Sequence, residues 1–125
     1  MNGNKLTSLP SQIGELINLK SLYLDDNQLT SLPVEIGQLK SLQYLSLYQN
    51  PMSKLPNEIG ALENLQYLEL ESSQLMSVPP EYLKKLKNLI KVTLRDKEDL
   101  NPLKKADLEL LRQVMHWCEV VWEKD

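Results

Sequence analysis

The chain has 125 residues, of which 42% are hydrophobic and 25% are charged, and its formal net charge is -3. This length allows one ordinary domain, and the composition is typical of a folded protein rather than of a disordered tail. The mild acidity argues against general nucleic-acid binding, no apolar run approaches the roughly 18 residues of a membrane helix, and one cysteine with one histidine cannot form a closed structural zinc site.

Leucine dominates the composition, with 27 of 125 residues, and the leucines recur with a period of 23 residues. Internal repetition of this length is the signature of a solenoid, in which each repeat stacks on the next. One extra residue near Pro80 lengthens the last row. The main columns of the repeat are Asn4, Asn27, Asn50 and Ser73; Leu22, Leu45 and Leu68; Pro10, Pro33, Pro56 and Pro79; Ile13, Ile36 and Ile59; and Gly14, Gly37 and Gly60.

Each row predicts a strand, a turn and a helical segment, in that order. Leu22 and Leu24 alternate with polar neighbours, so we expect a strand with its leucines inward and the intervening residues outward. Because the phase is the same in every row, the strands should lie side by side and parallel. The asparagine column suits the turn, since an amide both donates and accepts hydrogen bonds. The segment Pro-x-x-Ile-Gly-x-Leu should form the opposite wall, because proline blocks strand pairing and the Ile/Leu spacing fits a helical turn.

These columns resemble the leucine-rich repeat family in its 23-residue form, LxxLxLxxNxLxxLPxxIGxL, over residues 4 to about 95. The rows are most similar to small bacterial members that are numerous in spirochaetes. The resemblance implies an α/β fold: a right-handed horseshoe solenoid with a parallel sheet of about four strands on the concave face and short helical turns on the convex face. It also implies protein binding by the concave face, a candidate role in host interaction, and no catalysis by the repeats. Ser73 and Lys97 replace the expected asparagine, which predicts a weaker polar ladder toward the C-terminus.

The N-terminal end of the solenoid is expected to lack a cap. Met1 falls in the column of Leu24, so the chain begins where a strand ends. We therefore expect the edge of the Ser21–Asp25 strand to be unpaired unless residues 1–3 or another molecule cover it. Two interpretations stay open: upstream coils were lost, or copies of the chain pair through this edge into a homo-oligomer.

The C-terminal end is expected to be capped by a helix. We assign residues 1–100 to the repeats, with an incomplete first row, and residues 101–125 to an amphipathic capping helix of the same domain. Asn101 and Pro102 are typical of a helix N-cap and of the first helical position. A helical wheel places most apolar side chains on one broad face that would cover the last coil. These side chains are Leu103, Leu110, Leu111, Val114, Met115, Trp117, Cys118, Val121 and Trp122.

His116 and Cys118 are the one histidine and the one cysteine of the chain, and they are the candidates for a metal ligand or a nucleophile. On the predicted helix they lie on opposite faces, so they cannot share an ion or act as base and nucleophile within one subunit. We interpret Cys118 as a core residue and His116 as a surface residue, and a metal held by His116 between molecules stays open. Trp117 and Trp122 flank the apolar face. Two interpretations fit this position: the cap buries both rings, or one of them contacts a partner. Phosphate loops, nucleophile elbows and metalloprotease motifs are missing, so we expect no enzyme and no cofactor.

Four of the five tyrosines fall at outward strand positions, where folding does not require aromatic rings. Tyrosine offers rigid contact area and a hydroxyl group, and it is enriched where proteins bind each other. Carboxylates such as Asp25 and Glu69 are interpreted as solvated charges, while Lys91 and Arg95 lie at one end. We therefore expect a protein partner on the concave face, and neither nucleic acid nor membrane; a plain stable sheet surface is the alternative. The predicted partner-binding residues are Tyr23, Asp25, Tyr44, Ser46, Tyr48, Tyr67, Glu69, Glu71, Lys91 and Arg95.

The first ten residues, MNGNKLTSLP, contain no hydrophobic signal core. We therefore expect a cytoplasmic protein. A secreted or surface protein whose leader was removed is the alternative.

Overall fold

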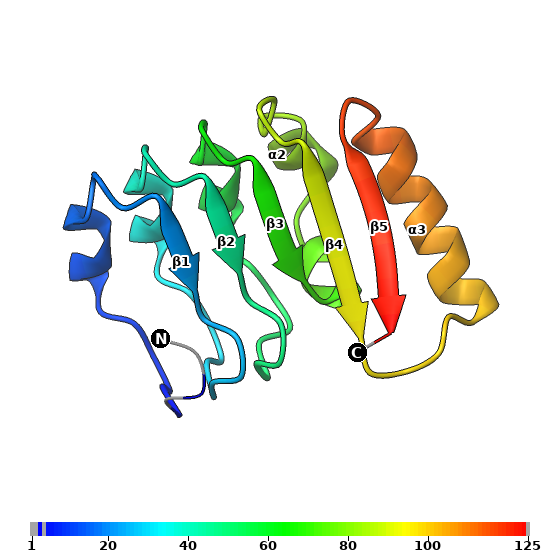
Figure 1. Ribbon diagram of the computed structural model, residues 1–125, viewed down its shortest axis with the longest axis horizontal. Coiled ribbons are helices and arrows are strands. Elements are labelled where there is room, and N and C mark those ends of the chain that lie inside the picture. Colours follow the sequence, from blue (N-terminus) through cyan, green and yellow to red (C-terminus); the bar gives the residue numbers. More distant parts are fainter. Residues whose placement is uncertain (1–2, 4, 125) are drawn as a thin grey trace.

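Successive coils of the chain build one parallel sheet that runs the length of the molecule, and each coil returns through a helical segment (Figure 1). The computed structural model describes residues 3 and 5–124. The strands follow in chain order as β1 (Ser21–Tyr23), β2 (Tyr44–Ser46), β3 (Tyr67–Leu70), β4 (Lys91–Asp96) and β5 (Glu119–Lys124). The helical segments are the 3-10 helices η1 (Ser11–Glu15), η2 (Val34–Gln38) and η3 (Asn57–Ala61) and the α-helices α1 (Ser72–Met76), α2 (Pro80–Leu83) and α3 (Pro102–Val114).

The register of the sheet places equivalent residues of the repeat side by side. Leu22 pairs with Leu45, Leu45 with Leu68, and Leu68 with Val92. These side chains are buried and belong to one continuous core between the sheet and the helical wall. The prediction of parallel strands with inward leucines is therefore confirmed.

Proline and glycine shape the helical wall of each coil. Pro33 and Pro56 immediately precede η2 and η3 in an extended conformation, as Pro10 precedes η1. At Gly37 a Cβ atom would lie 2.8 Å from the main-chain oxygen of Glu58 in the next coil. The glycine column therefore lets the backbones of neighbouring helical segments approach more closely than a residue with a Cβ atom would allow.

Buried amide side chains hold the turns after the strands. The Asn50 amide nitrogen donates to the oxygen of Leu24 at 2.8 Å and of Leu47 at 3.0 Å, and its oxygen accepts from the Leu29 N–H at 3.1 Å. Asn27 repeats this arrangement one coil earlier, donating to the Leu24 oxygen at 3.0 Å. Asn4 lies outside the described residues.

The polar ladder continues in the next coil through Gln74, which the sequence analysis did not identify. Gln74 is fully buried and donates to the oxygens of Leu47 at 3.5 Å and Met52 at 3.3 Å, while its own oxygen accepts from the Glu71 N–H at 3.0 Å. The expected Ser73 is exposed. The helical turn α1 shifts the inward position by one residue, and the longer glutamine side chain restores the reach. Lys97 is likewise exposed one coil later.

The C-terminal cap differs from the prediction of one helix over residues 101–125. The helix α3 begins after Asn101, whose side chain accepts from the Lys104 N–H, but it ends at Val114. The chain then turns and adds β5, which pairs parallel to β4, so the sheet has five strands rather than about four. Val120 and Val121 are β-branched and tolerate a strand, and the pairing with β4 decides in its favour.

Shortening the helix also changes which face it buries. Leu108, Leu111 and Met115 are buried, whereas Leu103 is 74% and Leu110 is 49% exposed, against the expectation from the wheel. The wheel was wrong because it included residues of β5, which displaced the apparent apolar face. Figure 1 shows α3 lying along the C-terminal end of the sheet beside β5.

Both tryptophans are half-buried in the cap, and each indole N–H has a partner. Trp117 donates to the Leu86 oxygen at 3.0 Å, and Trp122 donates to the Asp96 carboxylate at 2.9 Å. Both rings pack against the core. These contacts support the interpretation of burial rather than exposure to a partner.

The N-terminal end is covered in part by the first row. The Gly3 N–H donates to the Asp25 oxygen at 3.1 Å, and the Gln28 N–H donates to the Leu6 oxygen at 2.8 Å. Leu16 is nevertheless 47% and Ile17 59% exposed. The predictions for residues 1, 2 and 4 lie outside the described part of the chain.

Candidate functional site

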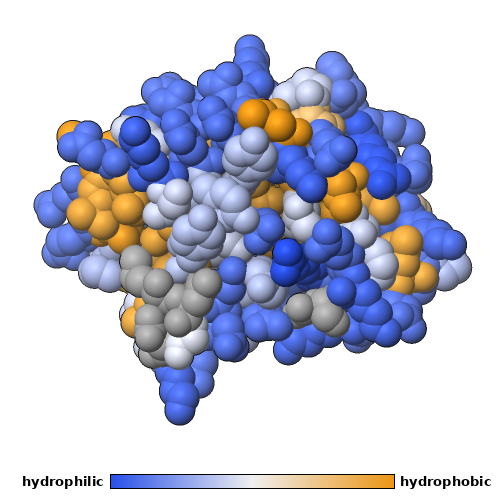
Figure 2. Space-filling view, viewed as in Figure 1, coloured by the Kyte–Doolittle hydropathy of each residue, from blue (hydrophilic) through white to orange (hydrophobic). Residues whose placement is uncertain are grey.

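The open side of the sheet carries four tyrosines, and we name the surface formed by Tyr23, Tyr44, Tyr48 and Tyr67 the tyrosine face. Tyr23 and Tyr44 have ring centroids 4.9 Å apart, and Tyr44 and Tyr67 have centroids 6.0 Å apart. Tyr23 and Tyr67 are exposed, and Tyr44 is half-buried between them. Viewed from this side, the surface over β1–β3 is pale, as residues of intermediate hydropathy are (Figure 2). Three neighbouring rings, tilted by 36° and 31° between successive planes, thus cross three strands.

A line of polar groups lies beside the rings. Asp25 Oδ1 accepts from the Ser46 hydroxyl at 2.6 Å and from the Tyr48 N–H at 3.1 Å. The same hydroxyl lies 3.2 Å from Glu69 Oε2, and its single proton can serve one carboxylate at a time. Asp25 and Ser46 are buried, so the expectation of solvated charges is wrong for Asp25. Its neighbours shield it, because hydrogen bonds to the next coil draw the carboxylate against the sheet.

This arrangement changes two acid–base equilibria. Burial raises the pKa of the Asp25 carboxyl above its ordinary value, and the nearby Glu69 charge adds to the increase, while the hydrogen bond from Ser46 opposes it. Burial, followed by the hydrogen bond to the Glu69 carboxylate, raises the pKa of Tyr44 to about 12. The Tyr44 hydroxyl therefore stays a proton donor above the pH at which an ordinary tyrosine, with a pKa of about 10, ionises.

Basic residues lie toward the C-terminal half of the face and are paired. The Arg95 guanidinium lies 3.6 Å from Glu69 and 3.5 Å from Glu123, and its Cζ is 4.9 Å from the Tyr48 ring centroid. Lys91 lies 3.7 Å from Glu119. Glu119 and Glu123 belong to β5, a segment predicted above to be helical. The alternation of Glu119, Val121 and Glu123 was the signal that could have placed them on this face.

A hollow of about 230 Å³ opens on this surface, and we name it the Tyr67 hollow. It is smaller than the roughly 300–1,000 Å³ typical of small-molecule sites, so it matches one side chain better than a cofactor. All ten predicted residues lie on the strands or turns of this sheet, and four of them line the hollow. The lining residues are Tyr44, Tyr67, Leu68, Glu69, Lys91 and Thr93.

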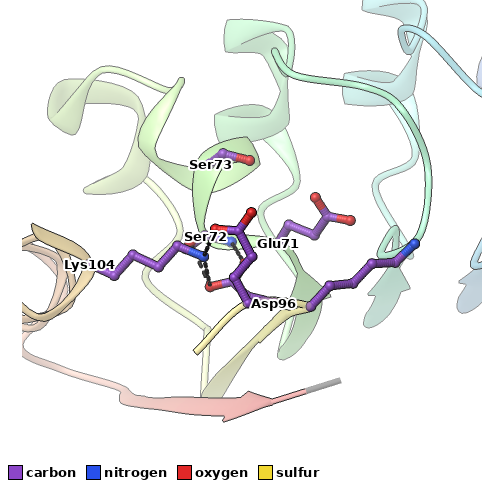
Figure 3. Close-up of a pocket in the computed structure, with 7 residues that line it drawn as sticks. Glu71, Ser72, Ser73, Asp96 and Lys104 are labelled. Atoms are coloured by element: carbon purple, nitrogen blue, oxygen red, sulfur yellow. Dashed lines mark hydrogen bonds and ion pairs between the residues drawn. The ribbon is translucent and has the colours of Figure 1, made fainter. Parts of the chain in front are cut away.

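A second hollow, of about 370 Å³, lies at the ends of β3 and β4 (Figure 3). Its central group is the buried Asp96, which accepts from the Ser72 N–H at 3.0 Å and from the Ser72 hydroxyl at 2.8 Å. The Lys104 ammonium lies 4.0 Å from the same carboxylate. The chain's own donors thus occupy Asp96, which indicates that this cluster joins coils together.

The structure places His116 and Cys118 in the turn between α3 and β5, so the argument from opposite helix faces was wrong. Cys118 is half-buried, with Sγ 3.6 Å from the Met115 oxygen, and burial raises the pKa of its thiol. His116 is exposed, and its ring meets the Trp117 ring edge-on at 5.7 Å. Among residues 3 and 5–124, no three histidine, cysteine, aspartate or glutamate side chains gather where they could hold a metal ion.

A family model described as "Leucine-rich repeat region" matches residues 2–124. The chain belongs to the leucine-rich repeat family. A leucine-rich repeat protein of Leptospira interrogans is 36% identical with a TM-score of 0.74, over 93% of this chain and 28% of its own. The chain therefore spans a little over a quarter of that protein's length. No curated protein matches the sequence significantly.

The predicted leucine-rich repeat fold is confirmed by solved structures. The leucine-rich repeat ectodomain of the receptor kinase SOBIR1 from Arabidopsis thaliana is 23% identical with a TM-score of 0.61, over 99% of this chain and 71% of its own. Leucine-rich repeat domains generally mediate protein–protein interaction and are typically non-catalytic. None of the helices in the described ranges has the length and apolarity needed to cross a bilayer.

Proposed function

We propose that this leucine-rich repeat domain binds a protein partner on its tyrosine face. The observation that carries the proposal is the row of three neighbouring rings, two of which are exposed: Tyr23 by 43% and Tyr67 by 38%. Exposed rings that already contact one another offer contact area without the loss of much side-chain entropy on binding. The hydroxyl groups of the exposed tyrosines supply hydrogen bonds that orient the partner.

The test compares tyrosines on the two walls of the solenoid. A photo-crosslinking amino acid in place of Tyr67 should capture a partner from extracts of the cells that make the protein, and the same group in place of Tyr82 should not. Tyr82 belongs to α2 on the opposite wall. The double variant Tyr23→Ala, Tyr67→Ala should weaken the captured complex by about tenfold or more, as loss of aromatic anchors does. Equal capture from both positions, or full affinity in the double variant, would reject the tyrosine face.

A second candidate function is self-association through the N-terminal end. Leu16 and Ile17 are exposed there, and a hollow of about 390 Å³ lined by residues 15–19 lies beside η1. Figure 2 shows apolar side chains gathered at this end of the molecule, over η1. Contiguous exposed apolar surface is typical of contact sites.

Light scattering over a wide concentration range tests this second function. We expect a dimer that Ile17→Lys disrupts. Val34→Lys is the matched control, because Val34 is 54% exposed on η2 and Ile17 is 59% exposed. A chain that stays monomeric at high concentration rejects self-association.

A further inference from the structure

The tyrosine face has more acidic than basic groups, which indicates the charge of its partner. At the outward-facing positions of the strands and their ends, five acidic groups outnumber two basic ones, and both basic ones are paired within the chain. Complementary charge steers association and selects partners. A basic partner segment therefore fits this face. The acidic residues are Asp25, Glu69, Glu71, Glu119 and Glu123, and the basic ones are Lys91 and Arg95.

The chain itself shows how this face holds a guanidinium group. Arg95 lies over the Tyr48 ring at 4.9 Å, with Glu69 and Glu123 on either side at 3.6 and 3.5 Å. A planar cation thus has an aromatic face beneath it and carboxylates at its edges. This combination uses both properties of guanidinium, stacking on a ring and fork-like pairing with carboxylate.

The Tyr67 hollow, one step along the sheet, borders the same Glu69 carboxylate from its other side, while Glu69 Oε1 faces Arg95 at 3.6 Å. Tyr44 and Tyr67 supply aromatic rings, and Glu69 supplies a carboxylate at the edge of the hollow. Across the described part of the chain, the cations found over tyrosine rings are Arg95 over Tyr48 and Lys85 over Tyr82. The Tyr67 ring is 38% exposed, so a cation from outside can reach it.

We propose that the Tyr67 hollow takes the guanidinium group of an arginine from a basic segment of the partner, stacked on Tyr67 or Tyr44 and paired with Glu69. This inference rests on the proposed function and names the chemistry of the partner. Arginine fits better than lysine, because a compact ammonium neither stacks nor pairs in a fork. Lys91 limits the site on its β4 side by like-charge repulsion.

The experiment uses the peptide acetyl-Gly-Arg-Gly-Arg-Gly-amide as probe and two-dimensional NMR of the whole chain as readout. We expect shift changes at Tyr44, Tyr67 and Glu69. The same peptide with citrulline in place of arginine keeps the shape without the charge, and it should bind about tenfold more weakly or worse. The lysine peptide should lie between the two.

Charge-matched variants separate the site from general electrostatics. Glu69→Gln should weaken binding of the arginine peptide about three- to tenfold, whereas Glu63→Gln, which removes an exposed carboxylate elsewhere, should leave it unchanged. Because Glu69 also contacts Ser46 and Arg95, thermal unfolding checks that the Glu69→Gln variant is still folded. Lys91→Gln provides an independent variant and should tighten binding a few-fold, with Lys54→Gln as its control.

Two results would overturn the inference: equal binding of the arginine and citrulline peptides, or preferred binding of an acidic peptide at the hollow. If either result is accompanied by partner capture at Tyr67, the proposed function stands and only the inference of a partner arginine is rejected. Binding of the arginine peptide without any capture at Tyr67 supports the hollow and counts against the protein partner instead.

Discussion

The side chains of Asn27, Asn50 and Gln74 join neighbouring coils by hydrogen bonds to main-chain groups that the turns leave without a strand partner. Buried main-chain polar groups need such partners, because each unpaired group costs about 1–3 kcal/mol. Gln74 performs this task from a helical turn, with a side chain longer by one methylene. Three coils therefore use a buried amide side chain for the same hydrogen bonds, although the backbone that carries it differs in the third.

Replacing this glutamine tests its role. Gln74→Ala leaves the Met52 oxygen and the Glu71 N–H without their side-chain partner and opens a cavity. We expect a loss of about 2–4 kcal/mol in the free energy of unfolding, measured by urea denaturation. Ser73→Ala, at the exposed neighbouring position, should change it by less than about 0.5 kcal/mol. Similar losses in both variants would contradict the assignment.

Asp25 predicts a dependence of stability on pH. Its pKa is raised in the folded chain by burial, so the folded state binds the proton more tightly than the unfolded state, where an aspartate titrates near about 3.9. The contribution of Asp25 is therefore fully present below the unfolded pKa and is lost as the pH rises through the folded pKa.

Asp25→Asn keeps the acceptor for Ser46 and Tyr48 but removes this charge. The variant should be more stable than the natural chain at pH 7, and the difference should shrink as the pH falls toward 4. Thermal unfolding at a series of pH values measures it. The control is Asp26→Asn, since Asp26 is exposed and asparagine tolerates its left-handed φ of 56°. A constant difference across the series would contradict the explanation.

Residues that repeat in columns could be placed from the sequence, and those that break the columns could not. Leu22, Leu45 and Leu68 are inward as the alternation predicts. Asp25 was predicted to be solvated and Ser46 to face outward, yet both are buried, because strand alternation gives the direction of a side chain and not what covers it. The burial of Gln74 depends on a one-residue shift that only the geometry of α1 creates.

Among the elements, the 3-10 helices pack more closely than helices with ordinary side chains can. A Cβ at Gly14, Gly37 or Gly60 would lie within 3.0 Å of a main-chain oxygen of the following coil. This spacing allows the helical wall to follow the spacing of strands, which is about 4.8 Å. The glycine column thus sets how tightly one wall of the solenoid can close.

The variant Gly37→Ala tests this spacing. The added methyl group would lie 2.8 Å from the Glu58 oxygen, and a backbone atom cannot turn aside as a side chain does. We expect a loss of about 1–3 kcal/mol in the free energy of unfolding. Val34→Ala, at an exposed position of the same helix, serves as control and should change it by less than about 0.5 kcal/mol. An unchanged midpoint for Gly37→Ala would show that the walls can separate.

The last two elements were the hardest to predict from sequence. The segment after Val114 has apolar residues at spacings that fit a helical wheel as well as a strand, and only the free edge of β4 decides between them. Pairing with β4 provides hydrogen bonds and buries Val120. A tertiary contact thus overrides a local pattern, and it brings Glu119 and Glu123 to the candidate site.

At the scale of the whole molecule, stability should vary along the solenoid, because each coil contacts only its neighbours. Two equivalent amides allow a matched comparison: Leu24 N–H donates to the Ser46 oxygen at 2.9 Å, and Leu47 N–H donates to the Glu69 oxygen at 2.8 Å. Both residues are fully buried. The coil that contains Leu24 is covered on its N-terminal side by the first row, which is itself only half-buried.

Hydrogen exchange measures this gradient. We expect the Leu24 amide to exchange at least about tenfold faster than the Leu47 amide. Local opening at the end of the solenoid breaks fewer contacts and therefore costs less free energy. Equal rates would mean that the domain opens as one unit, or that self-association covers the N-terminal end. Repeating the measurement with Ile17→Lys distinguishes these two cases, since that variant should not associate.

The uniform parallel register also affects how such a gene can change. Since hydrogen bonds between coils join the same positions in each repeat, as from Asn50 to Leu24, a duplicated repeat meets on both sides the neighbours that it already fits. Duplication of residues 24–46 would insert a further strand and a further tyrosine without moving the others out of line. The copy number of one repeat can therefore adjust how long a ligand this surface spans, while the surrounding coils keep their own contacts.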